Sequence, residues 1–331
     1  MPAKKEAMVG IDMGGTRMRA LVVNAENKIL GMHRAPTNPK QKTDRLVADI
    51  AALVEAAARS ASLKVSDLRS VSMGVPGAVD AESGVVYHAP NLGWKKVPLG
   101  SKLRALLKVP VFVENDVNVG VMGEYTLGAG QGARELVGIF VGTGIGGGIV
   151  NGGRLLLGSR GAAAEVGHIV IEMNGPLCGC GNRGCAEALA SRTAMERDVR
   201  DAIRRGEKSI VLKLMEERGR TRMTSSIIQR ALKEHDPVMV RVMEHAQFCL
   251  GILAANVVNM LDPEHVIIGG GIVARLGKDF VTPIRQTAYQ YFLRRHDARR
   301  VKILPGILGD DAGPFGAVAL ARQRLASKPA N

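Results

Sequence analysis

The segment MVGIDMGGTRMRALVVNAENKILGMHRAP, residues 8–36, decides the fold. It contains an apolar strand, a Gly/Thr turn, a second apolar strand, an Asn-containing turn and a third strand. The same order recurs in LVGIFVGTGIGGGIVNGGRLLLGSRGA, residues 136–162. The chain has 331 residues, which is more than one hydrophobic core usually organises. Two strand meanders of one design therefore predict two related domains.

Alternating helical and strand-like patterns follow each meander. The helical patterns lie at 44–61 and 235–261, and the strand-like runs at 71–77, 109–116 and 264–272. We therefore predict duplicated α/β domains. The final segment AVALARQRLA has helical spacing and is expected to return to the first domain. The predicted domains are residues 1–122 with 312–331, and residues 123–311.

The composition argues against a nucleic-acid partner despite a net charge of +14. Aromatic residues make up only 3% of the chain, which leaves few stacking platforms for single strands. The basic residues alternate with acids, as in RTAMERDVRDAIRRGEK at 192–208, a pattern typical of a solvated helix face. The excess positive charge would also attract an anionic substrate such as a nucleotide or polyphosphate.

We expect a cytoplasmic protein without a membrane span. The start, MPAKKEAMVGIDMGG, has no sustained apolar core, and the sequence contains no run of about 18 apolar residues. A metal-type cysteine cluster without a secretion signal fits a reducing compartment. Cys249 stands apart in FCLGILAANVV and is expected to be a buried small hydrophobe.

The segment EVGHIVIEMNGPLCGCGNRGCAE, residues 165–187, predicts a zinc site. His168 is followed by Cys178, Cys180 and Cys185, which together form the complete ligand shell of a tetrahedral structural zinc. The alternative is a Gly-rich turn with incidental thiols. A closed ligand shell argues against metal catalysis and favours a structural role for the ion.

Two carboxylates, Glu165 and Glu187, bracket this predicted zinc site. The ion would hold them beside one another although they are distant in the chain. Two fixed carboxylates suit a polyhydroxylated ligand, whose hydroxyl groups donate hydrogen bonds in defined directions.

The turn Asp12-Met13-Gly14-Gly15-Thr16 is a candidate phosphate loop. Glycines between two strands expose backbone N–H groups that can surround a phosphate, and the Thr16 hydroxyl adds a donor. Asp12 at the strand end could hold Mg²⁺ directly or through water. The pentapeptide alone is equally typical of an ordinary Asp/Gly hairpin.

A second candidate phosphate loop includes Thr143 and Gly144 in GTGIGGG, residues 142–148. It contains G-x-G-x-x-G, but a hairpin pattern rather than a helix follows, so the dinucleotide-binding interpretation fails. The sequence also lacks G-x-x-x-x-G-K-[ST]. Two Gly-rich hairpins in paired domains predict a nucleotide clamped in the cleft between them. Gly270 and Gly271, after the strand EHVII, are expected to approach the nucleoside.

The strand VPVFVEND ends on Asn115-Asp116, the candidate catalytic pair. Asn and Asp at this place are also typical helix caps. In the functional interpretation, Asp116 accepts a proton from a substrate hydroxyl as it attacks a γ-phosphorus, and Asn115 orients the ligand. Gly77 ends the turn-forming sequence Gly74-Val75-Pro76-Gly77, and its backbone either only shapes this turn or also touches the ligand.

With these motifs assembled, the chain resembles the ROK family of repressors, open reading frames and sugar kinases, most closely its bacterial glucokinases. The resemblance runs from D-x-G-G-T through ENDVN and GTGIGGG to the zinc segment. It implies a two-domain actin-like (ribonuclease H-like) fold of duplicated βββαβαβα domains, with an inter-domain cleft and a zinc-binding insertion. The residues that it places on the hexose are Gly77, Asn115, Asp116, Glu165, His168 and Glu187, with His168 also on zinc. Ala164 and Val117 depart from the usual Gly and Ala, which bears on substrate breadth.

The resemblance implies a kinase that uses ATP with Mg²⁺ to make glucose 6-phosphate, with Asp116 as the base and domain closure around the substrates. Alternatives within the family are kinases for N-acetylglucosamine, N-acetylmannosamine, fructose or mannose, and a kinase that uses polyphosphate. A non-catalytic sugar sensor is the alternative of another class. About a dozen residues precede the first loop, too few for a helix-turn-helix DNA reader. The family implies a homodimer or a dimer of dimers.

Overall fold

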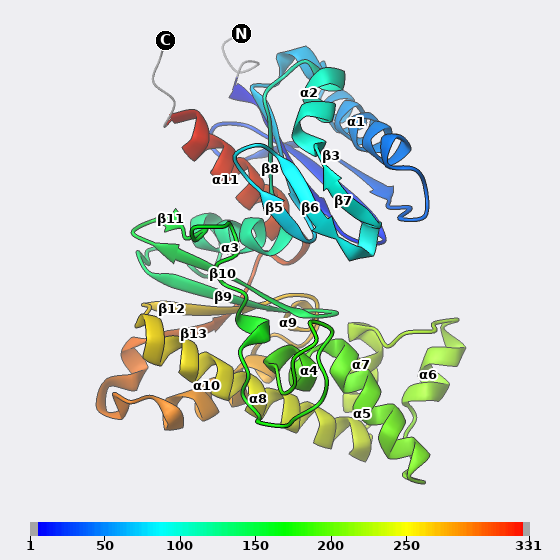
Figure 1. The fold of residues 1–331 in the computed structure, drawn as a ribbon, viewed down its shortest axis with the longest axis vertical. Coiled ribbons are helices and arrows are strands. Elements are labelled where there is room, and N and C mark those ends of the chain that lie inside the picture. The colour runs from blue at the N-terminus through cyan, green and yellow to red at the C-terminus, as the bar shows by residue number, and fades with distance from the viewer. Residues whose placement is uncertain (1–5, 327–331) are drawn as a thin grey trace. The chain divides into compact units, whose positions relative to one another are not determined.

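The structure is a computed structural model that describes residues 6–326. The chain forms two compact units, each with its own five-stranded sheet (Figure 1). The first unit comprises Met1–Gln131, Leu155–Ala163 and Asp310–Asn331, and the second comprises Gly132–Arg154 and Ala164–Gly309. These units are defined by contacts alone, so the domain boundaries expected from the sequence stay a prediction.

The two sheets share one topology, which confirms the duplication. In the first unit the order is β3-β2-β1-β4-β8, and in the second it is β11-β10-β9-β12-β13. The first sheet comprises β1 (Met8–Met13), β2 (Arg17–Val23), β3 (Ile29–Pro36), β4 (Ser70–Val75) and β8 (Val111–Asn115). The second comprises β9 (Leu136–Val141), β10 (Ile145–Asn151), β11 (Arg154–Leu155), β12 (His265–Gly269) and β13 (Lys302–Pro305). In the first sheet, β1 pairs antiparallel with β2 and parallel with β4. In the second sheet, β9 likewise pairs antiparallel with β10 and parallel with β12.

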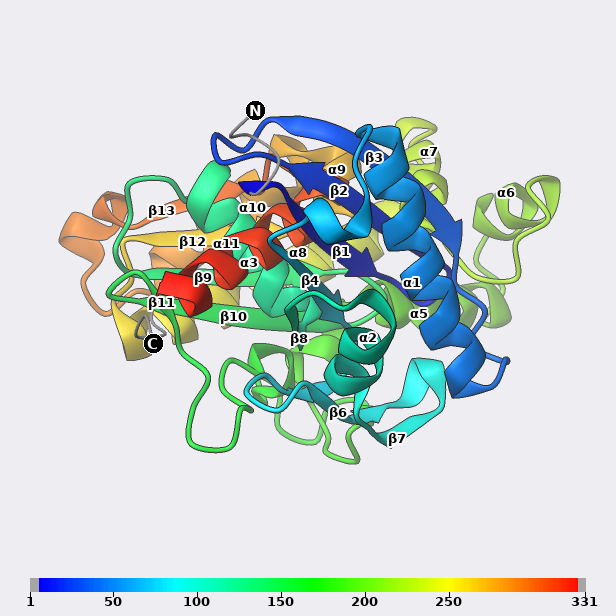
Figure 2. The ribbon, with the colours of Figure 1, turned by 90° about the horizontal axis from the view of Figure 1, so that it is seen from above.

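Helices cover both faces of the first sheet. Helices α1 (Thr43–Ser60) and α2 (Leu99–Leu107) bury apolar side chains in one core with Val9 and Ile11 of β1. Helix α11 (Ala312–Ala326) packs on the other face with α3 (Asp116–Leu127), and Figure 2 shows α1 and α11 on opposite sides of the strands. Gly10 permits this contact, because a Cβ there would lie 2.0 Å from the Pro314 carbonyl oxygen. The last helix thus belongs to the first unit.

A small sheet in the first unit was missed by the sequence analysis. It comprises β5 (Ala78–Asp80), β6 (Val85–Ala89) and β7 (Trp94–Val97). The only tryptophan, Trp94, is 2% exposed and packs in the core of this unit. Short 3₁₀ turns occur along the chain at Val65–Asp67, Pro90–Leu92, Val166–His168, Arg295–Arg300 and Gly309–Asp311.

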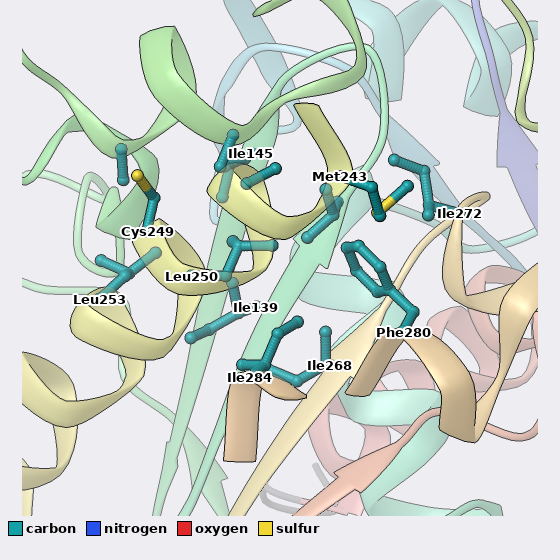
Figure 3. Packing of buried hydrophobic residues seen from close by; sticks show 14 of the residues in the cluster. Ile139, Ile145, Met243, Cys249, Leu250, Leu253, Ile268, Ile272, Phe280 and Ile284 are labelled. Carbon is teal, nitrogen blue, oxygen red and sulfur yellow. The ribbon is translucent and has the colours of Figure 1, made fainter. Parts of the chain in front are cut away.

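The second unit is built around the long helix α8 (Pro237–Leu261), which packs against α10 (Lys278–Tyr291). Figure 3 shows side chains from α8, α10 and the sheet meeting in one core. Cys249 lies in that core and is 6% exposed, as predicted. The remaining helices are α4 (Ala186–Ala190), α5 (Arg192–Arg204), α6 (Val211–Glu217), α7 (Ser225–Lys233) and α9 (Val273–Leu276).

Helix α8 is long and apolar enough to cross a membrane by length and composition alone. Of its most apolar 18-residue window, 67% is buried inside the structure. A largely buried helix of this kind is typical of the centre of a globular core, and its apolar character is explained by the packing in Figure 3.

Candidate functional site

The junction between β8 and α3 carries the candidate catalytic pair. Asn115 caps α3: its Oδ1 accepts hydrogen bonds from the N–H groups of Val117 (2.9 Å) and Asn118 (3.1 Å). Its Nδ2 donates to the Gly77 carbonyl oxygen at 3.0 Å. The capping interpretation of Asn115 is therefore confirmed, and the same amide ties down the Gly77 turn. Asp116 begins the helix, where the positive end of the helix dipole favours a carboxylate.

Gly77 requires the absence of a side chain. Its φ is +111°, and a Cβ would lie 2.2 Å from the His88 carbonyl oxygen. Both facts exclude other residues without a shift of the backbone. The Gly77–Asn115 contact thus brings together two of the residues singled out from the sequence, although they are 38 positions apart.

A buried ion pair behind this junction was missed by the sequence analysis. Glu114 Oε1 accepts hydrogen bonds from the Asn115 N–H (3.0 Å) and from Asn118 Nδ2 (3.1 Å). Glu114 Oε2 accepts from Arg324 Nη2 at 2.7 Å, and the Glu114 side chain is only 3% exposed. The Arg324 guanidinium also lies 5.9 Å from the centroid of the Phe112 ring. The sequence signal for this ion pair is Glu114 itself, because an acidic residue within the apolar run VFVEND needs a partner when it is buried.

Asp12, at the first glycine loop, lies near two other acidic groups. Burial, and then the negative charges of Asp116 and Asp310, raise the pKa of Asp12 to about 7. Arg17 pairs with Asp310 at 3.2 Å and opposes this rise. The loop is tight, because the Gly14 N–H donates to the Arg17 carbonyl at 3.0 Å. A carboxylate held among like charges is suited to a cation, which would remove the repulsion.

Replacing Asp12 with Asn is expected to stabilise the metal-free protein at both pH values, and clearly more at pH 8 than at pH 5. The pKa of Asp12 lies above its ordinary value of 3.8. Between these values the folded chain holds a proton that the unfolded chain has released, so the free energy of unfolding falls as the pH rises toward about 7. The gain at pH 8 should be on the order of 2–4 kcal/mol.

Urea unfolding at both pH values, in the presence of a chelator, measures this difference. Asp262→Asn is the matched control, because Asp262 is exposed at the end of α8 and undergoes the same chemical change. An equal effect of Asp12→Asn at pH 5 and pH 8 would contradict the elevated pKa.

The four predicted zinc ligands come together in the second unit. Their ligand atoms all lie within 4.8 Å of one another. Cys178 Sγ is 3.7 Å from His168 Nδ1, and Cys180 Sγ is 3.7 Å from Cys185 Sγ. A tetrahedral zinc with ligand bonds of about 2.0–2.3 Å requires separations of about 3.5–3.8 Å. The donor set therefore fits zinc in both identity and spacing.

The thiols differ in their readiness to ionise. Burial raises the pKa of Cys178, and burial together with hydrogen bonds from its neighbours raises the pKa of Cys185 to about 12. Cys180 is exposed, and the backbone N–H of Asn182 lowers its pKa. A cation must therefore displace protons from the two buried thiols, which couples its binding to pH.

Glu187 connects the zinc ligands to the second glycine loop. Its Oε2 accepts a hydrogen bond from the Ile145 N–H at 2.9 Å, and its Oε1 lies 3.8 Å from Cys178 Sγ. Gly144 makes room for it, because a Cβ there would lie 2.2 Å from Glu187 Oε2. The expected closeness of the Glu165 and Glu187 carboxylates stays a prediction.

The backbone before the zinc segment explains one departure noted in the sequence. Ala164 has a φ of +67°, a conformation that glycine adopts at lower cost. Glu165 follows it, is exposed, and begins the short turn that carries His168. Gly147 lies beneath, since a Cβ there would be 2.5 Å from the Ala164 carbonyl oxygen. Gly147 is therefore needed for packing, because a side chain there would collide with the backbone of Ala164.

The second glycine loop is a hairpin, as predicted. Strand β10 follows it and pairs antiparallel with β9, which excludes the dinucleotide-binding fold. Thr143 accepts hydrogen bonds at its carbonyl from Thr193 Oγ1 (2.7 Å) and at its hydroxyl from Arg192 Nη2 (2.6 Å). Gly270 has a φ of +94° and packs on the backbone of Val141, so the Gly269–Gly271 turn adjoins this loop. The sequence analysis did not single out Arg192.

A protein-family model described as the ROK family matches residues 8–324. The chain belongs to the ROK family. It is 35% identical over 318 residues to the glucokinase of Halalkalibacterium halodurans, covering 96% of this chain and 95% of that one. The xylose repressor of Caldicellulosiruptor bescii is 30% identical over 327 residues, which cover 98% of this chain and 80% of the repressor.

The fold of this ROK protein also matches solved ROK structures. The ROK family glucokinase of Streptomyces griseus, solved in complex with glucose and AMPPNP, superposes with a TM-score of 0.81 at 33% identity. The match covers 96% of this chain and 99% of that one. The expected actin-like sugar kinase fold is confirmed, and the glucokinase likenesses support a sugar kinase.

Proposed function

We propose that this ROK protein is a glucokinase that transfers the γ-phosphoryl group of ATP to the 6-hydroxyl of glucose. The observation that carries the proposal is a carboxylate, Asp116, at a braced strand-to-helix junction in a chain similar to glucokinases over almost its whole length. Glu114 supports that junction, because its Oε1 accepts hydrogen bonds from the Asn115 N–H and from Asn118 Nδ2. Such support suits a base that must keep one position through the reaction.

The proposed chemistry assigns each group a task. The 6-hydroxyl oxygen attacks the γ-phosphorus, the bond to the bridging oxygen breaks, and ADP leaves. Asp116 takes the hydroxyl proton. The hexose hydroxyls bind to Gly77, Asn115, Glu165, His168 and Glu187. The phosphates bind to Asp12, Gly14, Gly15, Thr16, Thr143 and Gly144, and the nucleoside to Gly270 and Gly271.

Two metal ions complete the proposal. Mg²⁺, held near Asp12, would neutralise negative charge on the phosphates. Zinc on His168 and the three cysteines of its cluster would have a structural role, because four protein ligands leave no open position. The chain's own part is to fix Glu187, which contacts both the cluster and the glycine loop.

Replacing Gly144 with Ala is expected to weaken glucose binding by about 10-fold or more. The new Cβ would displace the Glu187 carboxylate from the Ile145 N–H, and charge-assisted hydrogen bonds of this kind contribute about 1.5–3 kcal/mol. Isothermal calorimetry with glucose measures the effect. Gly142→Ala is the control in the same loop, because its Cβ would meet nothing closer than 4.0 Å. Equal losses in both variants would count against Glu187 as a sugar ligand.

A coupled phosphorylation assay tests the proposed function. The sugars are glucose, mannose, fructose, N-acetylglucosamine and N-acetylmannosamine, with ATP and polyphosphate as separate donors. Glucose with ATP is expected to give the highest kcat/KM. Preference for another sugar or for polyphosphate would select one of the alternatives within the family.

The similarity to a xylose repressor keeps the sugar-sensing regulator as the second candidate. Sugar binding without turnover of any sugar would favour it.

Filter binding at physiological salt tests the prediction of no nucleic-acid partner. Light scattering on the purified protein tests the predicted homodimer or dimer of dimers, and cytoplasmic localisation likewise remains a prediction.

A further inference from the structure

Arg192 lies between two turns of the second unit, the second glycine loop and the Gly269–Gly271 turn. Its Nη2 donates to Thr143 Oγ1 at 2.6 Å, in the second glycine loop. Its Nη1 donates to Ser225 Oγ at 3.4 Å and lies 3.9 Å from the place of a Cβ on Gly271. The backbone N–H of Arg192 donates to the Gly142 carbonyl at 3.0 Å. The guanidinium therefore spans the gap between the glycine loop and the Gly269–Gly271 turn.

The charge around Arg192 is not balanced. Glu196 is the nearby carboxylate, and it already accepts hydrogen bonds from Arg200 (3.0 Å), Arg222 (3.0 Å) and the Met223 N–H (2.9 Å). Within residues 6–326, no carboxylate oxygen lies within the 4.0 Å ion-pair distance of the Arg192 guanidinium. Burial, and then the positive charge of Arg222, lower the pKa of Arg192. An anion bound here would relieve the repulsion between the Arg192 and Arg222 guanidinium groups.

Other donors face the same region. The hydroxyls of Thr143 and Ser225 contact the guanidinium, and Arg222 Nη2 lies 3.4 Å from Thr193 Oγ1. Helices α5 and α7 both begin here, at Arg192 and Ser225, so the positive ends of their dipoles add to the field. Cationic side chains, hydroxyls and helix N-termini are together the groups that bind phosphate.

We propose that Arg192 binds the phosphate of the donor nucleotide that adjoins the nucleoside. The position follows from its two neighbours: the glycine loop is assigned to the terminal phosphates and the Gly269–Gly271 turn to the nucleoside. A group that contacts both lies beside the phosphate between them. This inference rests on the proposed function, because the assignment of both turns belongs to it.

A structural role for Arg192 makes a different prediction. If the side chain only braced the Thr143 loop, its loss would disturb the whole nucleotide site, and adenosine would bind more weakly as well. A phosphate contact affects only ligands that carry phosphate. The two roles are therefore separated by comparing adenosine with AMP and ADP.

The test measures binding of adenosine, AMP and ADP by calorimetry to the full chain and its variants. Arg192→Ala is expected to weaken the binding of AMP and ADP by about 10–100-fold, because a charge-assisted hydrogen bond is lost. The binding of adenosine should change by less than about 2-fold. Arg192→Lys should recover part of the loss, whereas Arg192→Met should not. Arg204→Ala is the control, because Arg204 is exposed at the far end of α5 and bonds to Asp201.

Two results with the Arg192→Ala variant would overturn the inference: unchanged binding of AMP and ADP, or an equal loss of adenosine binding. A wild-type chain that binds none of the three ligands would overturn it too. The proposed function is tested separately by sugar phosphorylation in the wild-type chain. Binding of ADP without turnover would reject the kinase and leave the Arg192 comparison to decide the phosphate contact.

Discussion

Asn in place of Asp116 is expected to lower kcat by about 10²–10⁴-fold, the usual contribution of a general base, with little change in the KM for glucose. The amide keeps an oxygen for the Val117 N–H, which Asp116 Oδ1 now accepts at 2.9 Å, so the start of α3 should keep its geometry. The amide cannot take a proton at neutral pH. The loss should therefore fall on the chemical step.

Steady-state kinetics with saturating ATP measures this effect, and the Asp262→Asn variant controls for the change of charge. Calorimetry with glucose checks that the sugar still binds. Near-normal turnover would remove Asp116 as the base. A large rise in the KM for glucose at unchanged kcat would assign it to sugar binding instead. The variant should also lower the pKa of Asp12, because Asp116 is one of the charges that raise it.

Cys180→Ser is expected to reduce zinc to well below one ion per chain and to abolish measurable glucose binding. Cys180 is the exposed thiol of the set, and its lowered pKa makes it the readiest to lose its proton. Without the ion, the two buried thiols would stay protonated, because their pKa values are raised. The turn carrying His168 and the start of α4 carrying Glu187 would then lose their common anchor.

Elemental analysis of purified protein measures the zinc, and calorimetry measures glucose binding in the same samples. Cys249→Ser is the matched control, since it removes a thiol from the core of α8 outside the cluster. Wild-type protein without zinc would reject the ligand assignment. Full glucose affinity in zinc-free Cys180→Ser would separate the metal from the sugar site.

The parts of the fold that could be predicted are those with local signals. In the meander at residues 8–36 and its repeat at residues 136–162, each strand and turn is a run of consecutive residues with its own pattern. The duplicated sheets could therefore be predicted from the sequence. The zinc ligands fall within 18 residues by their numbers, from His168 to Cys185, and the spacing predicts their chemistry. The β5–β7 sheet was missed because its strands are three to five residues long, too short to show a period.

The parts that could not be predicted depend on contacts between distant positions. Arg324 reaches Glu114 across 210 positions, and Arg192 reaches Thr143 across 49. Arg192 lies in a helical segment rich in charge, and Arg324 lies near the end of α11, so a solvated side chain is the ordinary expectation for both. Gly147 shows a similar limit, because it was placed in a phosphate loop but lies in β10, where the backbone of Ala164 packs on it. Only the assembled backbone reveals such close approaches.

The return of α11 to the first unit has a consequence for biosynthesis. Strands β1 and β4 need this helix to cover one face, yet its residues are translated after every other helix and strand of residues 6–326. The second unit, whose segments end at Gly309, has all of its residues before α11 emerges from the ribosome. We therefore expect the first unit to mature after the second, with β1 and β4 exposed to chaperones until α11 emerges from the ribosome.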